Sequence, residues 1–147
     1  MKGSMVPLAV EGIADWSNDE MAGVDLGDKR LNRRAQETLT KLGKHPSGSI
    51  PYGCDDWADT KATYELFKNE KVTAEKLRQP HQERTWERVV KEKCVLAVQD
   101  TSLLDYSHYE KMEGLGPIGT KAQNLRGVLL HGTMAVTPAG VPLGHLH

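Results

Sequence analysis

The sequence predicts an α+β protein in which helices come first and strands follow. Up to Lys93, apolar residues recur at helical spacing between residues that typically cap or end helices. From Cys94 onward, short runs rich in Val and Leu are separated by turns that contain Gly and Pro. The 147 residues suffice for one ordinary domain or two small ones. We therefore expect a helical part, 1–93, and a strand-forming part, 94–147.

Composition limits the class of protein. Hydrophobic residues make up 38% of the chain and charged residues 27%, which fits a folded protein rather than a disordered one. The net charge is −1, so any binding to nucleic acid must depend on local charge asymmetry. No run approaches the roughly 18 apolar residues of a membrane span, and the first residues do not resemble a signal peptide. We expect a cytoplasmic protein without membrane contact, in which Cys54 and Cys94 are unpaired thiols or form a single disulfide.

Four helices are expected in the first part. Residues 13–22 predict a short helix, and 23–43 predict a longer one that begins at Asp25 or Asp28 and ends at Gly43. The apolar stripe of this second helix is Leu31, Ala35, Leu39 and Leu42. After a turn-rich loop at 45–56, the third helix takes its apolar positions from Trp57, Ala58, Ala62, Tyr64, Leu66 and Phe67. The fourth helix, within 71–93, has Thr73 as its N-cap and a break or kink at Pro80.

The strands follow from shorter patterns. Residues 94–100, "CVLAVQD", form a continuous apolar run that is typical of a strand buried on both faces and ends at Asp100. Residues 127–136 and those from Val141 onward predict a hairpin, with its turn at Thr137–Gly140. The intervening stretch 107–125 is rich in glycine and predicts a loop.

The second helix is predicted to carry basic residues opposite its apolar stripe. A cationic face beside a loop of Ser and Gly suits contacts to phosphates. The alternative is an ordinary solvated helix face, since basic faces are common. The candidate DNA-contacting residues are Lys29, Arg30, Arg33, Arg34, Lys41, Lys44 and His45.

Asp100 is the candidate catalytic residue and metal ligand. A carboxylate at the C-terminal end of a strand lies where sheet-based active sites place acids, and its oxygens can bind Mg²⁺. The alternative is a turn or cap residue. One carboxylate cannot form a two-metal site by itself. The residues of 105–109, "DYSHY", are interpreted as ordinary polar loop residues rather than as acid–base groups.

Several stretches, taken in order, resemble the insertion-sequence-four family of bacterial cut-and-paste DDE transposases. They are "LGDKRLNRRA", "YELFKNEKVTAEKLRQPH", "VLAVQDTSLLDYSHY", "LGPIGTKAQNLRGVLLH" and "GHLH", and together they cover about residues 13–147. The resemblance implies a helical domain at 1–93 that binds the double-stranded DNA of transposon ends. It implies that 94–147 form the first three strands of an RNase H-like catalytic domain.

By motif match, Asp100 is the first of the three carboxylates that hold Mg²⁺ in this family for phosphodiester hydrolysis and strand transfer. Residues Arg30, Arg33, Lys44 and His45 fall in the region that binds the transposon end, and His45 stands where a close relative has Tyr. The family's second Asp and its Glu have no counterpart here, because Asp105, Glu110 and Glu113 do not match them.

We therefore expect a truncated transposase that binds transposon-end DNA and does not cleave DNA alone. It is expected to self-associate or to pair with full-length transposase. One alternative is an enzyme half that a second polypeptide completes, and another is a protein-interaction module. The strands also need cover over apolar side chains, from the amino-terminal helices or from another chain. These side chains are Val95, Leu96, Val98, Val128, Leu129 and Val136.

Overall fold

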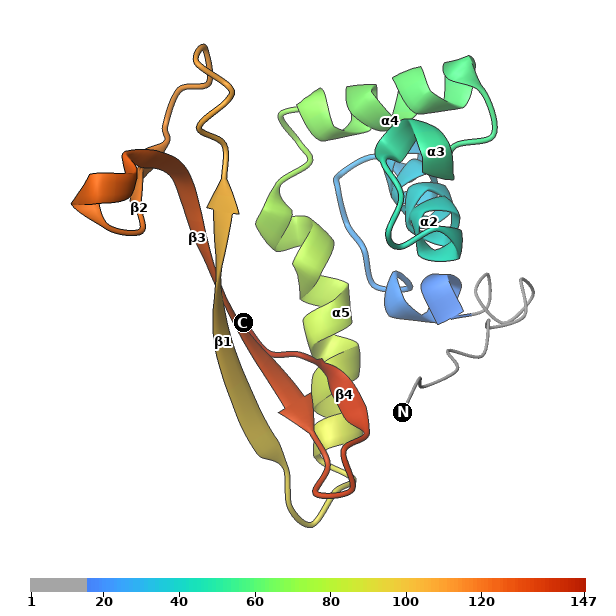
Figure 1. The fold of residues 1–147 in the computed structure, drawn as a ribbon. Coiled ribbons are helices and arrows are strands. Elements are labelled where there is room, and N and C mark those ends of the chain that lie inside the picture. Colours follow the sequence, from blue (N-terminus) through green and yellow to red (C-terminus); the bar gives the residue numbers. More distant parts are fainter. Residues whose placement is uncertain (1–15) are drawn as a thin grey trace. The chain divides into compact units, whose positions relative to one another are not determined.

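The computed structural model describes residues 16–147 and has the predicted α+β organisation, with helices before strands (Figure 1). Backbone contacts divide the chain into two compact units, 1–84 and 85–147, which we call the helical unit and the sheet unit. The division falls inside helix α5, whereas the sequence places a boundary between residues 93 and 94. Within 16–147, no helix is both long enough and apolar enough to cross a membrane.

Among the described residues after position 20, the helical unit contains three complete helices and the first part of a fourth. They are α2 (Lys29–Lys44), α3 (Ile50–Gly53), α4 (Trp57–Lys68) and α5 (Ala74–Val89). Residues 16–20 are also helical, inside the predicted 13–22, of which 13–15 lie outside the described residues. The predicted end of α2 at Gly43 is wrong by one residue, since His45 is the C-cap. Helix α3 forms within the predicted loop, and Pro51 in its first turn suits a helix start.

Helix α5 continues through Pro80, so of the predicted break or kink at this residue the break is wrong. Thr73 does cap the helix, because its hydroxyl accepts a hydrogen bond from the backbone N–H of Lys76 at 3.2 Å. Proline removes one backbone hydrogen bond from a helix interior and crowds the preceding turn. Pro80 is buried, and the burial of its apolar ring favours the folded helix.

The core of the helical unit surrounds Leu26, whose exposed fraction is 0%. The predicted stripe of α2 faces this core, but the predicted apolar face of α4 is largely wrong. Trp57 is 76% exposed, whereas Thr60 and Thr63 are buried. Threonine can take inward positions here because its hydroxyl finds a local partner, as Thr60 does with the carbonyl of Asp56 at 3.0 Å. The core residues are Met21, Val24, Leu26, Ala35 and Leu66, with Leu31, Leu39, Val72 and Leu77 packed against them.

The sheet unit holds an antiparallel sheet of β1 (Leu96–Asp105), β2 (Gly116–Ile118), β3 (Leu125–Val136) and β4 (Pro142–His145). Strand β3 pairs with each of the others. The predicted hairpin is confirmed, and its turn is closed by a 2.9 Å hydrogen bond from the N–H of Gly140 to the carbonyl of Thr137. The predicted loop at 107–125 is only partly right, because it contains β2 and a 3₁₀ turn, η1 (Lys121–Gln123).

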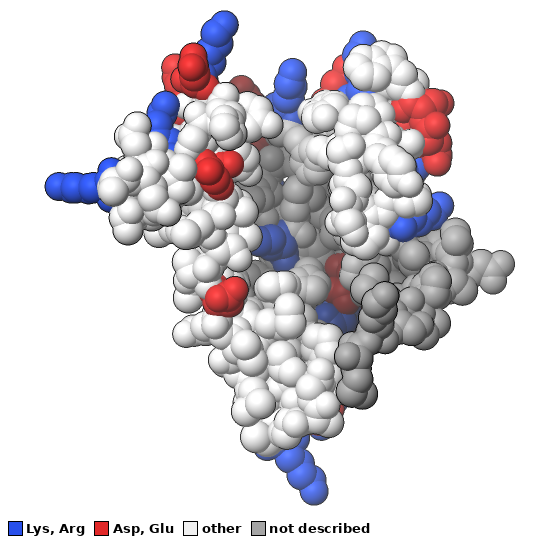
Figure 2. All heavy atoms as spheres, in the orientation of Figure 1, with Lys and Arg blue, Asp and Glu red and all other residues white. Residues whose placement is uncertain are grey.

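Strand β1 differs from its prediction in length and burial. It continues past Asp100 to Asp105, so Asp100 lies mid-strand, opposite Gly132 of β3. The side chains of Leu96 and Val98 are about half exposed, at 49% and 51%, and the surface over β1 is mostly uncharged in Figure 2. The polar residues after position 99 do not end the strand, because pairing with β3 satisfies their backbone groups whatever their side chains are.

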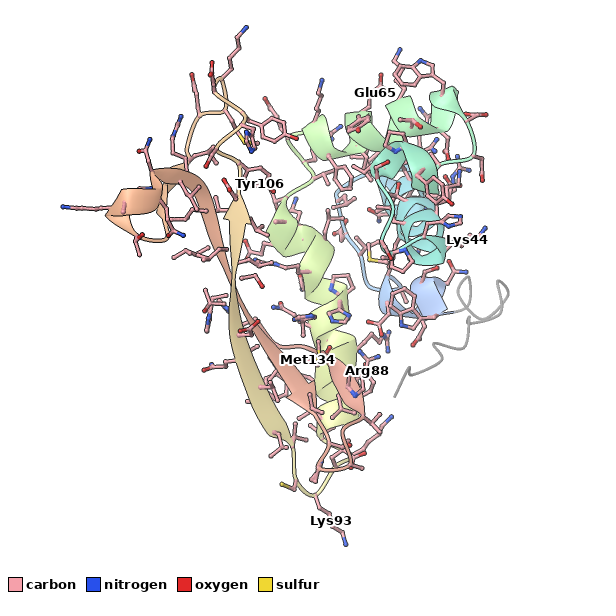
Figure 3. All side chains as sticks on the ribbon, viewed as in Figure 1. Lys44, Glu65, Arg88, Lys93, Tyr106 and Met134 are labelled. Atoms are coloured by element: carbon pink, nitrogen blue, oxygen red, sulfur yellow. The ribbon has the colours of Figure 1, made fainter. Side chains whose placement is uncertain are left out.

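The last turn of α5 belongs to the sheet unit and contacts β4. Arg88, labelled in Figure 3, donates a hydrogen bond from Nε to the carbonyl of Leu143 at 2.6 Å. Gly144 has a φ of +138°, and a Cβ at this position would lie 2.2 Å from the hydroxyl oxygen of Thr85. Glycine therefore permits both the backbone conformation and the close approach of helix and strand.

Candidate nucleic-acid interface

Helix α2 begins at a turn formed by Leu26, Gly27 and Asp28. Gly27 has a φ of +75°, a conformation that glycine adopts without strain. The carboxylate of Asp28 accepts a hydrogen bond from the backbone N–H of Arg30 at 2.7 Å and so caps the helix. Asp25, the other predicted cap, instead accepts from the N–H of Gly27 at 2.8 Å. Because Leu26 is buried just before the cap, the start of α2 is anchored in the core.

The seven candidate DNA-contacting residues all lie on α2 or at its C-cap, but the structure divides them into groups. Five are exposed, and we call the four Lys and Arg residues among them the outer basic face. Of these, only Arg33 has an ion-pair partner among the described residues, a 3.6 Å contact with Glu37 one turn along the helix. Such exposed pairs contribute little to stability, so the charges are available to a ligand. The outer basic face is Lys29, Arg30, Arg33 and Lys44, the last of which is labelled in Figure 3.

Arg34 and Lys41 instead point their charges towards α4. Arg34 Nη1 lies 3.3 Å from Asp59 Oδ1. Lys41 is ion-paired with the same carboxylate and, at 3.2 Å, with Asp55. The side chains of Lys41 and Asp59 are only 23% and 11% exposed. These two cations therefore hold α2 against α4.

The electrostatics of this network keep its central pair ionised. The hydrogen bond from Lys41 lowers the pKa of Asp59 below its ordinary value, while burial opposes this effect and the charge of Arg34 adds to it. Burial acts to lower the pKa of Lys41, but its hydrogen bonds to Asp59 and Asp55 outweigh burial, so this pKa is raised. Both groups are consequently charged at neutral pH, and the link between the helices persists there.

His45 lies beside an aromatic residue at the end of α2. The two rings, of His45 and Tyr52, meet edge to face with centroids 5.0 Å apart and planes at 75°. Tyr52 is 69% exposed, so its ring is accessible to a ligand at the end of α2, where Lys44 is the last helical residue. An exposed aromatic beside a cation suits contact with the bases or sugars of a nucleic acid. Tyr52 is not among the residues that the sequence singles out, and the only signal for it is its place between Pro51 and Gly53 in a short polar segment.

Asp100 does not belong to a cluster of potential metal ligands in the part of the chain that the structure describes. Its neighbours on the same face of β1 are Val98 and Ser102. Hydrogen bonds from the hydroxyl of Ser107, at 2.5 Å, and from its N–H, at 2.8 Å, lower the pKa of Asp105 and hold that carboxylate in a turn. Across 16–147, no three His, Cys, Asp or Glu side chains gather as metal ligands. The described residues thus do not fit a two-ion Mg²⁺ site, in which several carboxylates hold ions about 4 Å apart.

Residues 13–72 match the family model described as transposase DNA-binding. The matched segment contains all of α2, α3 and α4, and with them the outer basic face, the ion pairs to α4 and the His45–Tyr52 pair. The match supports a transposase amino-terminal region in this part of the chain, with DNA as its partner. Asp100 and the strands lie outside the matched residues.

Proposed function

We propose that this chain binds the double-stranded DNA of transposon ends through α2 and the loop after it. The observation that carries the proposal is the position of the outer basic face, which lies wholly within the segment that matches transposase DNA-binding. The cap at Asp28 fixes the N-terminal end of α2, and the ion pairs of Arg34 and Lys41 with Asp59 hold one side of α2 against α4. The exposed cations are therefore presented by a rigid support, which lowers the entropic cost of binding.

The residues of the proposed interface have different roles. Arg30 and Arg33 carry planar guanidinium groups that can donate two hydrogen bonds to one phosphate, whereas Lys44 acts as a point charge. His45 and Tyr52 offer a ring surface for a sugar or base. Arg34 and Lys41 support the interface by holding α2 to α4, so their effect on DNA binding is indirect.

We infer further that the chain does not cleave DNA by itself. DDE transposases, which the chain resembles, hold Mg²⁺ with three carboxylates, and Asp100 is the candidate for the first of them. What supports the inference is that, among the described residues, Asp100 is not part of any group of three or more His, Cys, Asp or Glu side chains that could hold a metal. An RNase H-like arrangement of the strands belongs to the same proposal, and the antiparallel pairing of β1 with β3 is compatible with it.

The test is fluorescence anisotropy with the terminal repeat of the parent element and a scrambled duplex, over a range of salt concentrations. We expect tighter binding to the terminal repeat. Arg30→Ala and Arg33→Ala should each weaken it and reduce the slope of log K against log salt by about 0.9, the value for one neutralised phosphate. Arg78→Ala is the matched control, because Arg78 is exposed on α5 and forms no ion pair with another described residue.

The Asp100→Ala variant is a second control for the binding measurement. It should bind the terminal repeat as the unmodified chain does, since Asp100 lies outside the proposed interface. If the unmodified chain has no preference for the terminal repeat at any salt concentration, end recognition is refuted. An equal loss of affinity for Arg30→Ala and Arg78→Ala would instead mean that binding follows net charge and not the outer basic face.

A further inference from the structure

A second basic feature lies in the sheet unit, outside the matched residues 13–72. A groove of about 510 Å³ is bounded by β2, η1 and the start of β3. The charged residues that line it are Lys121 and Arg126, and Asn124 adds a side-chain amide; no carboxylate takes part. Figure 2 shows basic side chains that project into solvent around β2 and η1.

The three polar side chains of this groove are available to a ligand. Lys121, Asn124 and Arg126 form no side-chain hydrogen bond or ion pair with another described residue. The polar groups of η1 beside them are internally satisfied, because Thr120 donates to Gln123 Oε1 from its N–H at 2.9 Å and from its hydroxyl at 3.0 Å. This differs from α2, where Arg34 and Lys41 are engaged by α4.

The surrounding sequence and the groove walls favour a negative ligand. From Gly114 to His147 the only Lys and Arg residues are Lys121 and Arg126, and the segment has neither Asp nor Glu. No carboxylate of this segment can therefore neutralise the two cations. The walls of the groove include Leu115, Pro117 and Leu125, and apolar walls strengthen an electrostatic interaction by lowering the local dielectric.

The backbone holds the groove in shape. Pro117 of β2 pairs with Arg126 of β3. The N–H of Arg126 donates to the hydroxyl of Ser107 at 2.9 Å, and its carbonyl accepts from the N–H of Tyr106 at 2.9 Å. Tyr106, labelled in Figure 3, follows the end of β1. Arg126 is thus fixed between two strands, and the ligand does not have to order its backbone on binding.

We propose that this groove binds a phosphate of a nucleic-acid backbone. A phosphodiester offers one negative charge and several acceptor oxygens, which match a guanidinium, an ammonium and an amide. The groove exceeds the size of one phosphate and leaves room for the adjoining sugar. The proposal rests on the proposed DNA-binding function, because DNA is taken as the source of the phosphate. The expectation that the groove binds an oxyanion depends only on the residues of the groove.

The first arm of the test uses inorganic phosphate and the full 147-residue chain. In an NMR titration to tens of millimolar phosphate, the backbone amides of Gly119, Lys121, Asn124 and Arg126 should shift in a saturable way. The same amides should stay in place for the double variant Lys121→Gln/Arg126→Gln. The matched control is Lys91→Gln/Lys93→Gln, which removes two exposed charges of the same unit and should keep the shifts.

The second arm uses duplex DNA and separates a backbone phosphate from free phosphate. Lys121→Gln/Arg126→Gln should reduce the slope of log K against log salt by about 0.9, the value for the one phosphate that the groove is proposed to neutralise. Lys91→Gln/Lys93→Gln should leave this slope unchanged. Saturable phosphate shifts with an unchanged slope, or with no DNA binding at all, would overturn the nucleic-acid assignment. Absence of groove shifts with phosphate would overturn the site.

The two DNA proposals can fail separately. A terminal-repeat preference that depends on Arg30 and Arg33, with no slope change for the groove variant, would leave the end-binding function and remove the groove. Duplex binding without terminal-repeat preference, but with a salt slope that depends on Lys121 and Arg126, would support the groove and refute end recognition.

Discussion

The helical unit and the sheet unit are stabilised by different interactions. In the helical unit, Leu26 and its neighbours form a side-chain core, and the Lys41–Asp59 pair joins two helices beside it. In the sheet unit, Leu103, Leu129 and other apolar side chains are more than half exposed, and continuous backbone pairing between β1 and β3 dominates. Side-chain packing thus orients the proposed interface in one unit, whereas backbone pairing positions the proposed groove in the other.

The basic residues of the two units differ in the same way. On α2, packing against α4 engages Arg34 and Lys41 and leaves the outer basic face to solvent. Around β2 and η1, no acid among the described residues pairs with Lys121 or Arg126, so neither cation has a structural role in holding elements together. Reversing or removing the charge of Arg34 or Lys41 should therefore reduce the stability of the protein. The same changes at Lys121 or Arg126 should instead reduce ligand binding.

The largest expected effect is Leu26→Ala in the helical unit. Removing this fully buried side chain should destabilise the unit by about 2–5 kcal/mol, because the surrounding core cannot fill the space. Amide hydrogen exchange should accelerate in α2 and α4. Leu130→Ala is the matched change in the sheet unit, where the side chain is 58% exposed, and should cost less than about 1 kcal/mol. Equal destabilisation at the two positions would contradict the distinction between the units.

Gly127→Ala tests the backbone pairing of the sheet unit. A Cβ at Gly127 would lie 1.9 Å from the carbonyl oxygen of Leu104, so β1 and β3 would have to separate locally. We expect a destabilisation of about 1–3 kcal/mol, with faster exchange of the β1 and β3 amides. The control is Gly116→Ala at the cross-strand partner, where an added Cβ meets nothing within 4 Å. A stable Gly127→Ala variant with unchanged exchange would show that the strands are less tightly paired.

The smallest effect is expected for Asp59→Asn, which removes the charge between α2 and α4. We expect a destabilisation of about 1 kcal/mol at neutral pH by chemical denaturation, because a neutral amide oxygen replaces the carboxylate as the acceptor for the charged side chains of Lys41 and Arg34. Glu65→Gln, at an exposed pair with Lys61, should change stability by only about a few tenths of a kcal/mol. If the two variants lose similar amounts of stability, the ion pair between Asp59 and Lys41 contributes no more than an exposed surface pair.

The pH dependence of the same pair follows from its pKa shifts. Since the folded pKa of Asp59 lies below its ordinary value of 3.8, its contribution is present above that pH and is lost as pH falls through the lowered pKa. Since the pKa of Lys41 lies above its ordinary 10.5, its contribution is present below that pH and is lost as pH rises through the raised pKa. In Asp59→Asn, the loss of unfolding free energy that Asp59 causes as the pH falls below its ordinary pKa should be absent. Unfolding free energies measured over a range of pH should show this difference.

Local patterns in the sequence determined much of this protein. The Leu26–Gly27–Asp28 start of α2, the apolar stripe of the helix and the turn of the β3–β4 hairpin each depend on residues that are close in the chain. Caps, helical spacing and turn residues act over a few positions, so the order of helices before strands and the basic character of α2 could be predicted from sequence.

The tertiary structure decided which side chains are available and which are engaged. Arg34 and Lys41 look like the other cations of α2, but their partner Asp59 lies on another helix. Asp100 looks like a strand end, but pairing with β3 carries the strand on to Asp105. Thr63 is buried and Trp57 exposed because the packing of α4 within the helical unit, and not side-chain polarity, decides which side of the helix faces inward. Each of these outcomes depends on residues that are distant in sequence, and local patterns do not encode such interactions.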